Sequence, residues 1–434
     1  MVFHPQSRFR KRVPLFGVEP WFLGVILTLG GCAQSTVEEP PEDDALTAIL
    51  PSYIGSQSVG NCWLFTTTAW AEKLHERAGG TRKNFSESYL SYWSMFDNMT
   101  DRLRYVVGMA GAEGGYFSAA REVLRQRGLM TARDFSAGQD AQTTWQPNEQ
   151  FGGFDYNVDQ KEAVGAANAW IASGGLKRAP LAIAERRVYV RKALDEFWHI
   201  KPSMRATMTA VFGADFGRSV EDAPKDTFAQ HRIYRPADLT AAIYRPHMST
   251  PGVGTLGDLV NGGAVEATLG KTPHRYDGTG PQWTYSYGIA SVRRTVQRRM
   301  QRLLHQGIPV WMGWSVAQAA LGPDGVFHAG DVPQYTGRPP AGDGPHASLL
   351  IDYQVRLGQG PILPAGGARP AQALLDKALG DDVTFEFWRV QNSWGLGFSK
   401  NSTGMNDLEE GYLNAQFYAS RYGWLGAAFP EDME

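Results

Sequence analysis

The stretch Gln57-Ser58-Val59-Gly60-Asn61-Cys62-Trp63-Leu64-Phe65 decides the expected fold, because it places a cysteine where a helix begins. Trp70, Leu74 and Ala78 continue from Cys62 at helical spacing, and Gly79-Gly80 marks the end of this helix. The first turn of a helix presents unpaired backbone N–H groups and the positive end of its dipole. This position favours the thiolate of Cys62, the nucleophilic form of cysteine. Taken alone, the stretch also fits a buried core cysteine.

Two further stretches contain the residue types that a cysteine nucleophile needs. A histidine enters an apolar strand in Gly344-Pro345-His346-Ala347-Ser348-Leu349-Leu350, and a second strand ends in a polar turn in Trp388-Arg389-Val390-Gln391-Asn392-Ser393-Trp394-Gly395. In type and in order, the three stretches resemble the signatures of the papain family of cysteine peptidases. Cys-Trp-Leu-Phe and Phe85-Ser86-Glu87-Ser88-Tyr89-Leu90 are most similar to the bleomycin hydrolase branch. The resemblance covers about residues 50–135 and 285–415.

The resemblance implies an α+β, papain-like fold of two lobes. A helical half is followed by a β-rich half, and the active-site cleft lies between them. The resemblance also implies a catalytic triad. Cys62 is then the nucleophile, His346 its ion-pair partner and general acid, and Asn392 the group that orients the imidazole. Trp394 is expected to shield the His346–Asn392 hydrogen bond from water.

Two further roles follow from the resemblance. Gln57 is expected to donate to the oxyanion hole, together with the backbone N–H of Cys62. Gly114 and Gly115 match the glycine pair that exposes backbone to the main chain of the substrate, and the alternative is a simple turn before a helix. His328 is the only nearby rival for the role of the base, and His75 lies too far along the nucleophile helix to serve Cys62.

The sequence departs from the papain pattern in its spacings. Gln57 stands five residues before Cys62, whereas the family's glutamine stands six before, at the place that Ser56 occupies here. His346 follows Cys62 by 284 residues, which a large insertion at about 140–285 explains. Because 45 residues separate His346 from Asn392, the Gly/Pro/Ala-rich segment 358–382 is expected to loop out.

Local patterns predict the elements around these motifs. Helices are expected after the capping residue Ser86, over 117–127 with Gly128 at its end, over 188–198 and over 292–303. Strands are expected at 308–314, 346–353 and 384–391, a loop at 322–344, and a closing strand at Gly411-Tyr412-Leu413. The helix at 292–303 has an arginine-rich face, which is either solvated or anion-binding.

Composition limits the function classes. Of 434 residues, 43% are hydrophobic and 20% charged, as in ordinary soluble globular proteins, and the length allows one large domain with insertions or two domains. The net charge of −2 and the absence of a basic stretch with interleaved aromatics argue against a nucleic-acid binder. With two cysteines there is no disulfide framework, and no Cys/His cluster has zinc-ligand spacing. No metal or cofactor is expected.

The N-terminus resembles that of a bacterial lipoprotein. A basic region (Arg8, Arg10, Lys11, Arg12) precedes the apolar run 21–29, which ends in Leu29-Gly30-Gly31-Cys32. The resemblance implies a signal peptide at 1–31 and lipidation of Cys32; an uncleaved anchor is the alternative, although the run is short for a membrane span. Residues 32–46 form an acidic, proline-containing tether, and 47–434 the peptidase domain.

The favoured function is therefore a cysteine-type peptidase, held at the bacterial cell envelope by a lipid and acting on a peptide or protein. Two alternatives stay open. One is a cell-wall amidase, against which Trp63 and Asn392-Ser393-Trp394-Gly395 argue. The other is a non-catalytic binding lipoprotein that keeps the fold, against which the intact triad residues argue.

Overall fold

The structure is a computed structural model. It describes residues 49, 53–77, 80–100, 114–115, 117–140, 147–148, 153–154, 157–223, 231–236, 239, 243–245, 252–254, 264–267, 271–276, 280–285, 290–333, 343–367, 370–395, 399–400, 403–413 and 426–430. Contacts divide the chain into Met1–Pro41 and Glu42–Glu434, and every described residue belongs to the second unit. The expected signal peptide, Cys32 and the tether lie outside the described residues. Among the described residues, no helix combines the length and apolar character needed to cross a membrane.

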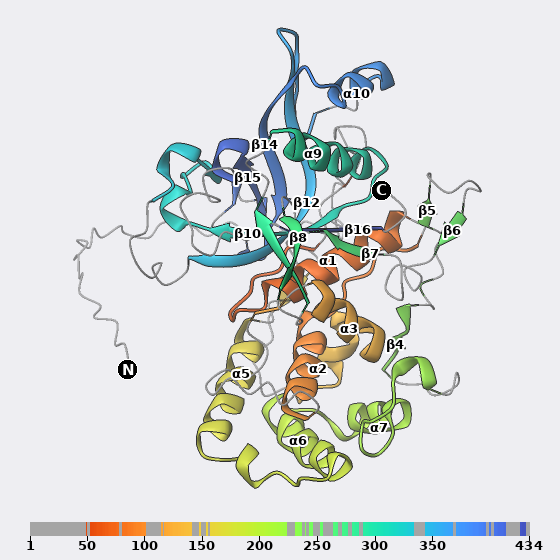
Figure 1. Ribbon diagram of the computed structural model, residues 1–434. Coiled ribbons are helices and arrows are strands. Elements are labelled where there is room, and N and C mark those ends of the chain that lie inside the picture. The colour runs from red at the N-terminus through yellow and green to blue at the C-terminus, as the bar shows by residue number, and fades with distance from the viewer. Residues whose placement is uncertain are drawn as a thin grey trace, which may run out of the picture. The chain divides into compact units, whose positions relative to one another are not determined.

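The first half of this unit is mainly helical (Figure 1). Its helices are α1 (Cys62–Arg77), α2 (Glu87–Thr100), α3 (Phe117–Arg127), α4 (Ala132–Ala137), α5 (Asn157–Ala172), α6 (Ile183–Phe197) and α7 (Pro202–Phe212). The Ser86 hydroxyl accepts a hydrogen bond from the Tyr89 N–H at 3.0 Å and caps α2, as expected. Gly128 ends α3 with φ +68°, a conformation that favours glycine.

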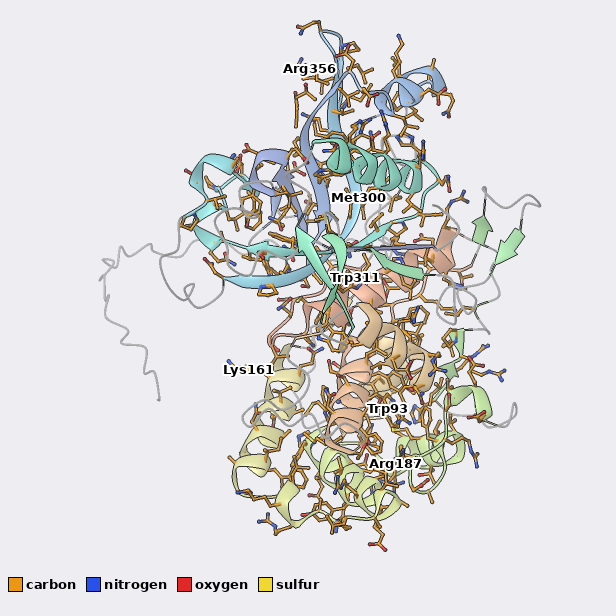
Figure 2. The ribbon with its side chains drawn as sticks, in the orientation of Figure 1. Trp93, Lys161, Arg187, Met300, Trp311 and Arg356 are labelled. Carbon is orange, nitrogen blue, oxygen red and sulfur yellow. The ribbon has the colours of Figure 1, made fainter. Side chains whose placement is uncertain are left out.

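An aromatic cluster forms the core of the helices. Trp93 of α2, labelled in Figure 2, is fully buried, and its ring packs against Phe96, Phe212 and Phe216 at centroid distances of 4.5 to 5.5 Å. The Arg127 guanidinium lies over the same ring and pairs with Asp97 at 2.5 Å. These contacts join α2 to the end of α3 and to α7, so that segment 140–285 contributes directly to the core.

The largest sheet has the order β11-β15-β14-β12-β10-β16-β7, and β13 pairs with β12. Its strands are β7 (Ala264–Ala267), β10 (Val310–Val316), β11 (Val326–Phe327), β12 (Gly344–Leu357), β13 (Ile362–Leu363), β14 (Val383–Gln391), β15 (Met405–Glu409) and β16 (Gly426–Pro430). Only β11 and β15 pair in parallel within it. Shorter pairs are β1 (Leu129–Met130) with β4 (Ile233–Tyr234), β2 (Pro147–Asn148) with β3 (Gly153–Phe154), β5 (Ile243–Arg245) with β6 (Gly252–Gly254), and β8 (Lys271–Tyr276) with β9 (Gly280–Tyr285).

Two helices pack against the centre of this sheet. Both α1 and α9 (Ala290–His305) contact β10 and β12, and all seven residues of β10 are buried (Figure 1). The Trp311 indole N–H of β10 donates to the Thr67 hydroxyl of α1 at 3.2 Å. The helix that begins at Cys62 is therefore held against the strand pair that includes His346.

Segment 358–382, which lies between His346 and Asn392 in the sequence, loops out as predicted. β12 and β14 pair over most of their length, and 358–382 lies beyond the ends of the pair with β13 and α10 (Gln372–Ala378). Arg294 and Arg298 of α9 donate to the backbone carbonyls of Ala378, Leu379 and Gly380 at the end of α10. These two arginines thus satisfy helix C-terminal carbonyls, a role that the sequence did not indicate.

The closing strand predicted at Gly411-Tyr412-Leu413 is wrong. The strand β15 ends at Glu409, and residues 410–413 form a helical turn instead. The Tyr412 hydroxyl donates to the Ser315 carbonyl at 2.9 Å and accepts from the Ala317 N–H at 2.9 Å. Because these bonds draw the Tyr412 ring beneath the end of β10, the chain turns inward after Glu409 and does not extend the sheet.

Candidate active site

Cys62 is the first residue of α1 and is only 8% exposed. The backbone groups of Ala347, the residue after His346, of Trp63 and of Cys62 itself lower the pKa of its thiol. The last two are first-turn groups, which lower the pKa as expected for a helix N-terminus. Burial outweighs them and raises the pKa of the thiol to about 11. Burial therefore opposes the thiolate that the helix position favours, and the resting state of Cys62 stays a prediction.

His346 lies in β12 opposite Trp314 of β10. Its Nε2 is 2.7 Å from Asn392 Oδ1, and since an amide oxygen only accepts, Nε2 carries the proton and Nδ1 is the free base. Burial lowers the pKa of His346 to about 4, against the opposite effect of the Asn392 hydrogen bond. Burial thus acts against the charged form of both Cys62 and His346.

Asn392 is held by its neighbours at the end of β14. Its Nδ2 donates to Asn406 Oδ1 at 3.0 Å, and its Oδ1 also accepts from the Ser393 N–H at 2.8 Å. Asn406 of β15 in turn donates to the Gly325 carbonyl at 3.0 Å. Asn406 fixes which way the Asn392 amide faces, and sequence reasoning missed it. The only signal was a polar pair, Asn406-Asp407, between the apolar residues Met405 and Leu408.

Aromatic rings cover the imidazole. The Trp394 ring is tilted by 32° over His346 at a centroid distance of 4.7 Å, and the Trp314 ring meets it edge-on at 5.4 Å. Trp394 is half-buried, and Phe327 packs against both tryptophans. Apolar cover of this kind excludes water from the His346–Asn392 hydrogen bond, as expected for Trp394.

Gln57 lies beside the turn that follows Asn392. Its backbone N–H donates to the Ser393 carbonyl at 2.7 Å, its Oε1 accepts from the Ser393 hydroxyl at 2.5 Å, and its Nε2 donates to the Val59 carbonyl at 3.2 Å. An amide nitrogen has two hydrogens, so this last bond uses one of them. Ser56 stands six residues before Cys62, as the family's glutamine does, and it forms an isolated backbone β-bridge with Trp394.

The glycine pair lies next to the nucleophile loop. The Gly114 N–H donates to the Gly60 carbonyl at 2.7 Å, and Gly114 is exposed with φ +76°. A Cβ on Gly115 would stand 2.4 Å from the Trp63 ring, so only glycine fits there. The pair is thus brought close to Cys62, and its contact with a substrate remains a prediction.

Neither of the two rival histidines is placed to serve Cys62. His328 Nδ1 is 2.9 Å from Glu409 and its Nε2 is 3.4 Å from Asp324; the Glu409 hydrogen bond is the main cause that raises the pKa of His328. His75 lies 13 residues along α1 from Cys62, a helical rise of about 20 Å. Neither residue competes with His346.

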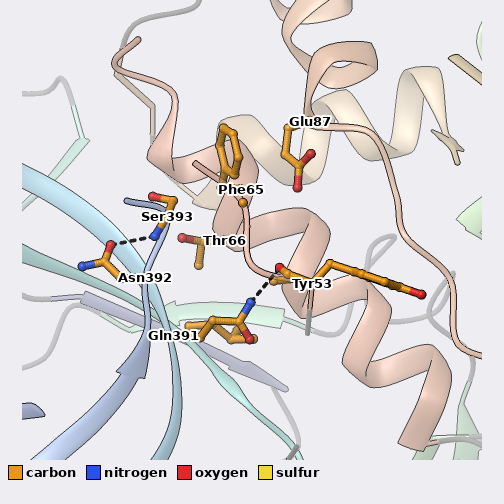
Figure 3. Close-up of a pocket in the computed structure, with 10 residues that line it drawn as sticks. Tyr53, Phe65, Thr66, Glu87, Gln391, Asn392 and Ser393 are labelled. Atoms are coloured by element: carbon orange, nitrogen blue, oxygen red, sulfur yellow. Dashed lines mark hydrogen bonds between the residues drawn. The ribbon is translucent and has the colours of Figure 1, made fainter. Parts of the chain in front are cut away.

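A small cavity lies behind the site, between α1, α2 and the end of β14 (Figure 3). Its lining includes Thr66, Glu87, Asn392 and Ser393. The Thr68 hydroxyl oxygen is 2.9 Å from Glu87 Oε1 and 2.9 Å from the Phe65 carbonyl oxygen, and its single proton can be donated to only one of them. A protonated Glu87 donates to Thr68 and satisfies all three groups. Consistently, burial raises the pKa of Glu87 to about 7.

This shift predicts a pH-dependent stability. The folded-state pKa of Glu87 lies above its ordinary value of 4.5, so its contribution is fully present below pH 4.5 and is lost as the pH rises through about 7. The unfolding free energy of the wild type should fall as the pH rises across this window, and in Glu87→Gln this fall should be smaller by at most about 3 kcal/mol. Denaturant unfolding at both ends of the window measures it. Burial also raises the pKa of Asp352 to about 7, but Asp352 is present in both proteins, so its contribution cancels in the comparison. Equal pH dependence of the two proteins would contradict the assignment.

The neutral thiol predicts a particular reactivity. In a Cys32→Ser background, where Cys62 is the sole thiol, alkylation by iodoacetamide should be slow at neutral pH and should rise continuously towards the pKa of about 11. Only the thiolate reacts, and its fraction grows tenfold per pH unit below the pKa. A rate plateau across neutral pH would instead demonstrate a resting thiolate–imidazolium pair.

A comparison of the sequence with protein families finds no match, and neither does a search of curated proteins. Solved structures similar to this chain include PepW from Lactobacillus rhamnosis, at 11% identity and TM-score 0.42 over 91% of this chain and 83% of that one. Xylellain, a cysteine protease from Xylella fastidiosa, is 11% identical with TM-score 0.31 over 90% and 86%. The ragweed pollen cysteine protease Amb a 11, in its proform, is 14% identical with TM-score 0.27 over 91% and 66%. Xylellain and Amb a 11 are cysteine proteases.

Proposed function

We propose that this chain is a cysteine-type peptidase that hydrolyses peptide bonds with Cys62, His346 and Asn392. The observation that carries the proposal is the meeting of three distant segments. Cys62 begins α1, which packs against β12, the strand that contains His346, and His346 Nε2 is 2.7 Å from Asn392 Oδ1. These are the three residues that the sequence motifs single out, in the order nucleophile, base and orienting amide.

The proposed reaction begins with a neutral pair. As the sulfur attacks the substrate carbonyl carbon, its proton passes to Nδ1 of His346, and the negative charge develops on the carbonyl oxygen. The C–N bond then breaks, and His346 gives this proton to the leaving amine, which leaves a thioester on Cys62. His346 next takes a proton from water, whose oxygen attacks the thioester. The C–S bond then breaks, His346 returns the proton to the sulfur of Cys62, and the acid product is released.

Other residues support these steps. The remaining N–H of Gln57 Nε2 and the backbone N–H of Cys62 are the proposed donors to the oxyanion. Gly114 and Gly115, which cannot be replaced without clash or strain, are proposed to accept the main chain of the peptide. Asn392 keeps the imidazole in one tautomer and one orientation, and Trp394 keeps water from the hydrogen bond between them.

The proposed architecture is papain-like, with two lobes and an active-site cleft. It is supported by the placement of Cys62 on a helix, of His346 on a strand of the main sheet, and of Asn392 directly after another strand of that sheet. Residues 47–434 would form this domain, with about 140–285 as an insertion into it. α5, α6 and α7 of the insertion pack in the helical core, so it would be an integral part of the fold.

We also propose that the peptidase is a lipoprotein of the bacterial cell envelope. The basic region and Leu29-Gly30-Gly31-Cys32 predict cleavage before Cys32 and lipid on its thiol. Mass spectrometry of the membrane-extracted protein should find Cys32 as the modified N-terminal residue, and Cys32→Ser should release the chain from the membrane fraction. An unmodified Cys32 on a chain that still begins at Met1 would contradict this proposal.

A peptide-library digest tests the function. The Cys32→Ser chain should cleave peptides, and the products should show whether it trims ends or cuts internally. Cell-wall fragments cleaved in place of peptides would identify an amidase. No cleavage of either substrate, together with specific peptide binding, would identify a non-catalytic binding protein.

A further inference from the structure

Asn61, the residue before Cys62, is fully buried and starts the nucleophile helix. Its backbone carbonyl accepts from the N–H groups of Leu64 at 2.8 Å and Phe65 at 3.4 Å. An asparagine at this position commonly caps its own helix with its side-chain oxygen. Here Nδ2 donates instead to Ser91 Oγ at 3.0 Å and to Gln160 Oε1 at 2.8 Å, and Oδ1 has no hydrogen-bond partner among the described residues.

Gln160 is the partner from the segment to which the motifs assign no catalytic part. It lies in the first turn of α5 and is fully buried. Its Oε1 accepts from Asn61, and its Nε2 donates to Ser88 Oγ of α2 at 3.0 Å. One amide therefore ties the start of α1 to α2 and α5. Because all these polar groups are buried, water cannot replace a lost partner without rearrangement.

We infer that Gln160 is a positioning residue for Cys62 that acts through Asn61. The side chain of Asn61 is anchored on both α2 and α5, and its main chain leads directly into Cys62. The torsions of Asn61 therefore set where the Cys62 N–H and sulfur point. The Asn61 side chain links the start of α1 to α2 and α5 and does not cap its own helix. This arrangement favours a positioning role over a role in helix formation alone. The inference rests on the proposed function, because it assigns Cys62 as the group whose position matters.

The test compares two glutamines in the Cys32→Ser chain. Gln160→Met keeps the length of the side chain and removes both hydrogen bonds. Gln139→Met is the matched control, since Gln139 is 4% exposed and donates to the Trp198 carbonyl at 3.1 Å. The alkylation rate of Cys62 by iodoacetamide, its pH profile, kcat and KM are measured for each.

Gln160→Met should lower the alkylation rate and kcat by about 10- to 100-fold, with KM within about threefold, because a displacement of about 1 Å can cost about 100-fold. Gln139→Met should leave these quantities near wild type, although both variants lower the melting temperature. Gln160→Glu, which keeps an acceptor for Asn61, should recover most of the rate. Wild-type alkylation and kcat in Gln160→Met, or equal effects in Gln139→Met, would overturn the inference.

A double-mutant cycle separates positioning from general destabilisation. If Gln160 acts through Asn61, the Asn61→Leu/Gln160→Met protein should be no slower than Asn61→Leu alone. Additive losses would overturn the inference, as would a Gln160→Glu protein as slow as Gln160→Met. If the wild type cleaves no peptide while alkylation still follows the predicted order, the proposed function fails and the positioning of Cys62 stands.

Discussion

Replacement of Cys62 by alanine should abolish peptide-bond cleavage, and His346→Ala should do the same. Cys62 supplies the atom that bonds to the substrate, and His346 both accepts and returns the proton, so no other group replaces either. Loss of the nucleophile or the base in a triad has cost about a millionfold in kcat in another peptidase, and a similar loss is expected here. Initial rates on any peptide cleaved by the wild type measure it.

The fold should survive both substitutions. Cys62→Ala removes one sulfur from a site at the edge of the core, and His346→Ala leaves Asn392 bonded to Asn406 and Ser393. Far-UV circular dichroism and the melting temperature are the controls. Wild-type turnover in either folded variant would show that the triad assignment is wrong. Asn392→Ala should be milder, because the amide orients the imidazole without bonding to the substrate.

Gln57→Ala should lower kcat by about a hundredfold to a thousandfold with little change in KM, the usual effect of losing one oxyanion donor. The amide is already oriented in the structure, since Ser393 fixes its oxygen and Val59 accepts from its nitrogen. Its shortened distance in sequence from Cys62 is therefore compatible with a defined placement. Steady-state kinetics on one peptide give both constants.

Ser393→Ala is the companion variant. It removes the hydroxyl that holds Gln57 Oε1 but leaves the Gln57 amide in place, so kcat should fall less than in Gln57→Ala. A kcat within about threefold of wild type in Gln57→Ala would be too small for an oxyanion donor and would assign that role to backbone N–H groups alone. Asn61 is not a substitute donor, because its Nδ2 faces Ser91 and Gln160.

The sequence predicted the parts of the fold that local patterns determine. Ser86 caps α2, Gly128 ends α3, and 358–382 lies outside the β12–β14 pair, because capping, glycine geometry and strand alternation act over a few residues. The strand expected at Gly411-Tyr412-Leu413 was wrong because a tertiary contact, the bonding of Tyr412 to the end of β10, overrides local preference there.

The site was predictable in its motifs and not in its environment. Cys62, His346 and Asn392 belong to recognisable patterns, and the structure brings them together. Asn406 and Gln160 belong to none, since each acts through one contact that only tertiary packing creates. The acidity of Cys62 is predictable only in part for a related reason: the helix N-terminus can be read from sequence, whereas the desolvation that opposes it cannot.

Covalent capture of Cys62 tests the central claim most directly. A peptidyl chloromethyl ketone places a peptide in the site and an electrophilic carbon where a substrate carbonyl would stand, so capture requires both binding and a competent nucleophile. In the Cys32→Ser chain, mass spectrometry should find the peptidyl adduct on Cys62, formed much faster than its alkylation by iodoacetamide, and strongly slowed in His346→Ala. An adduct on another residue, or one that forms on Cys62 no faster than simple alkylation and independently of His346, would contradict the account.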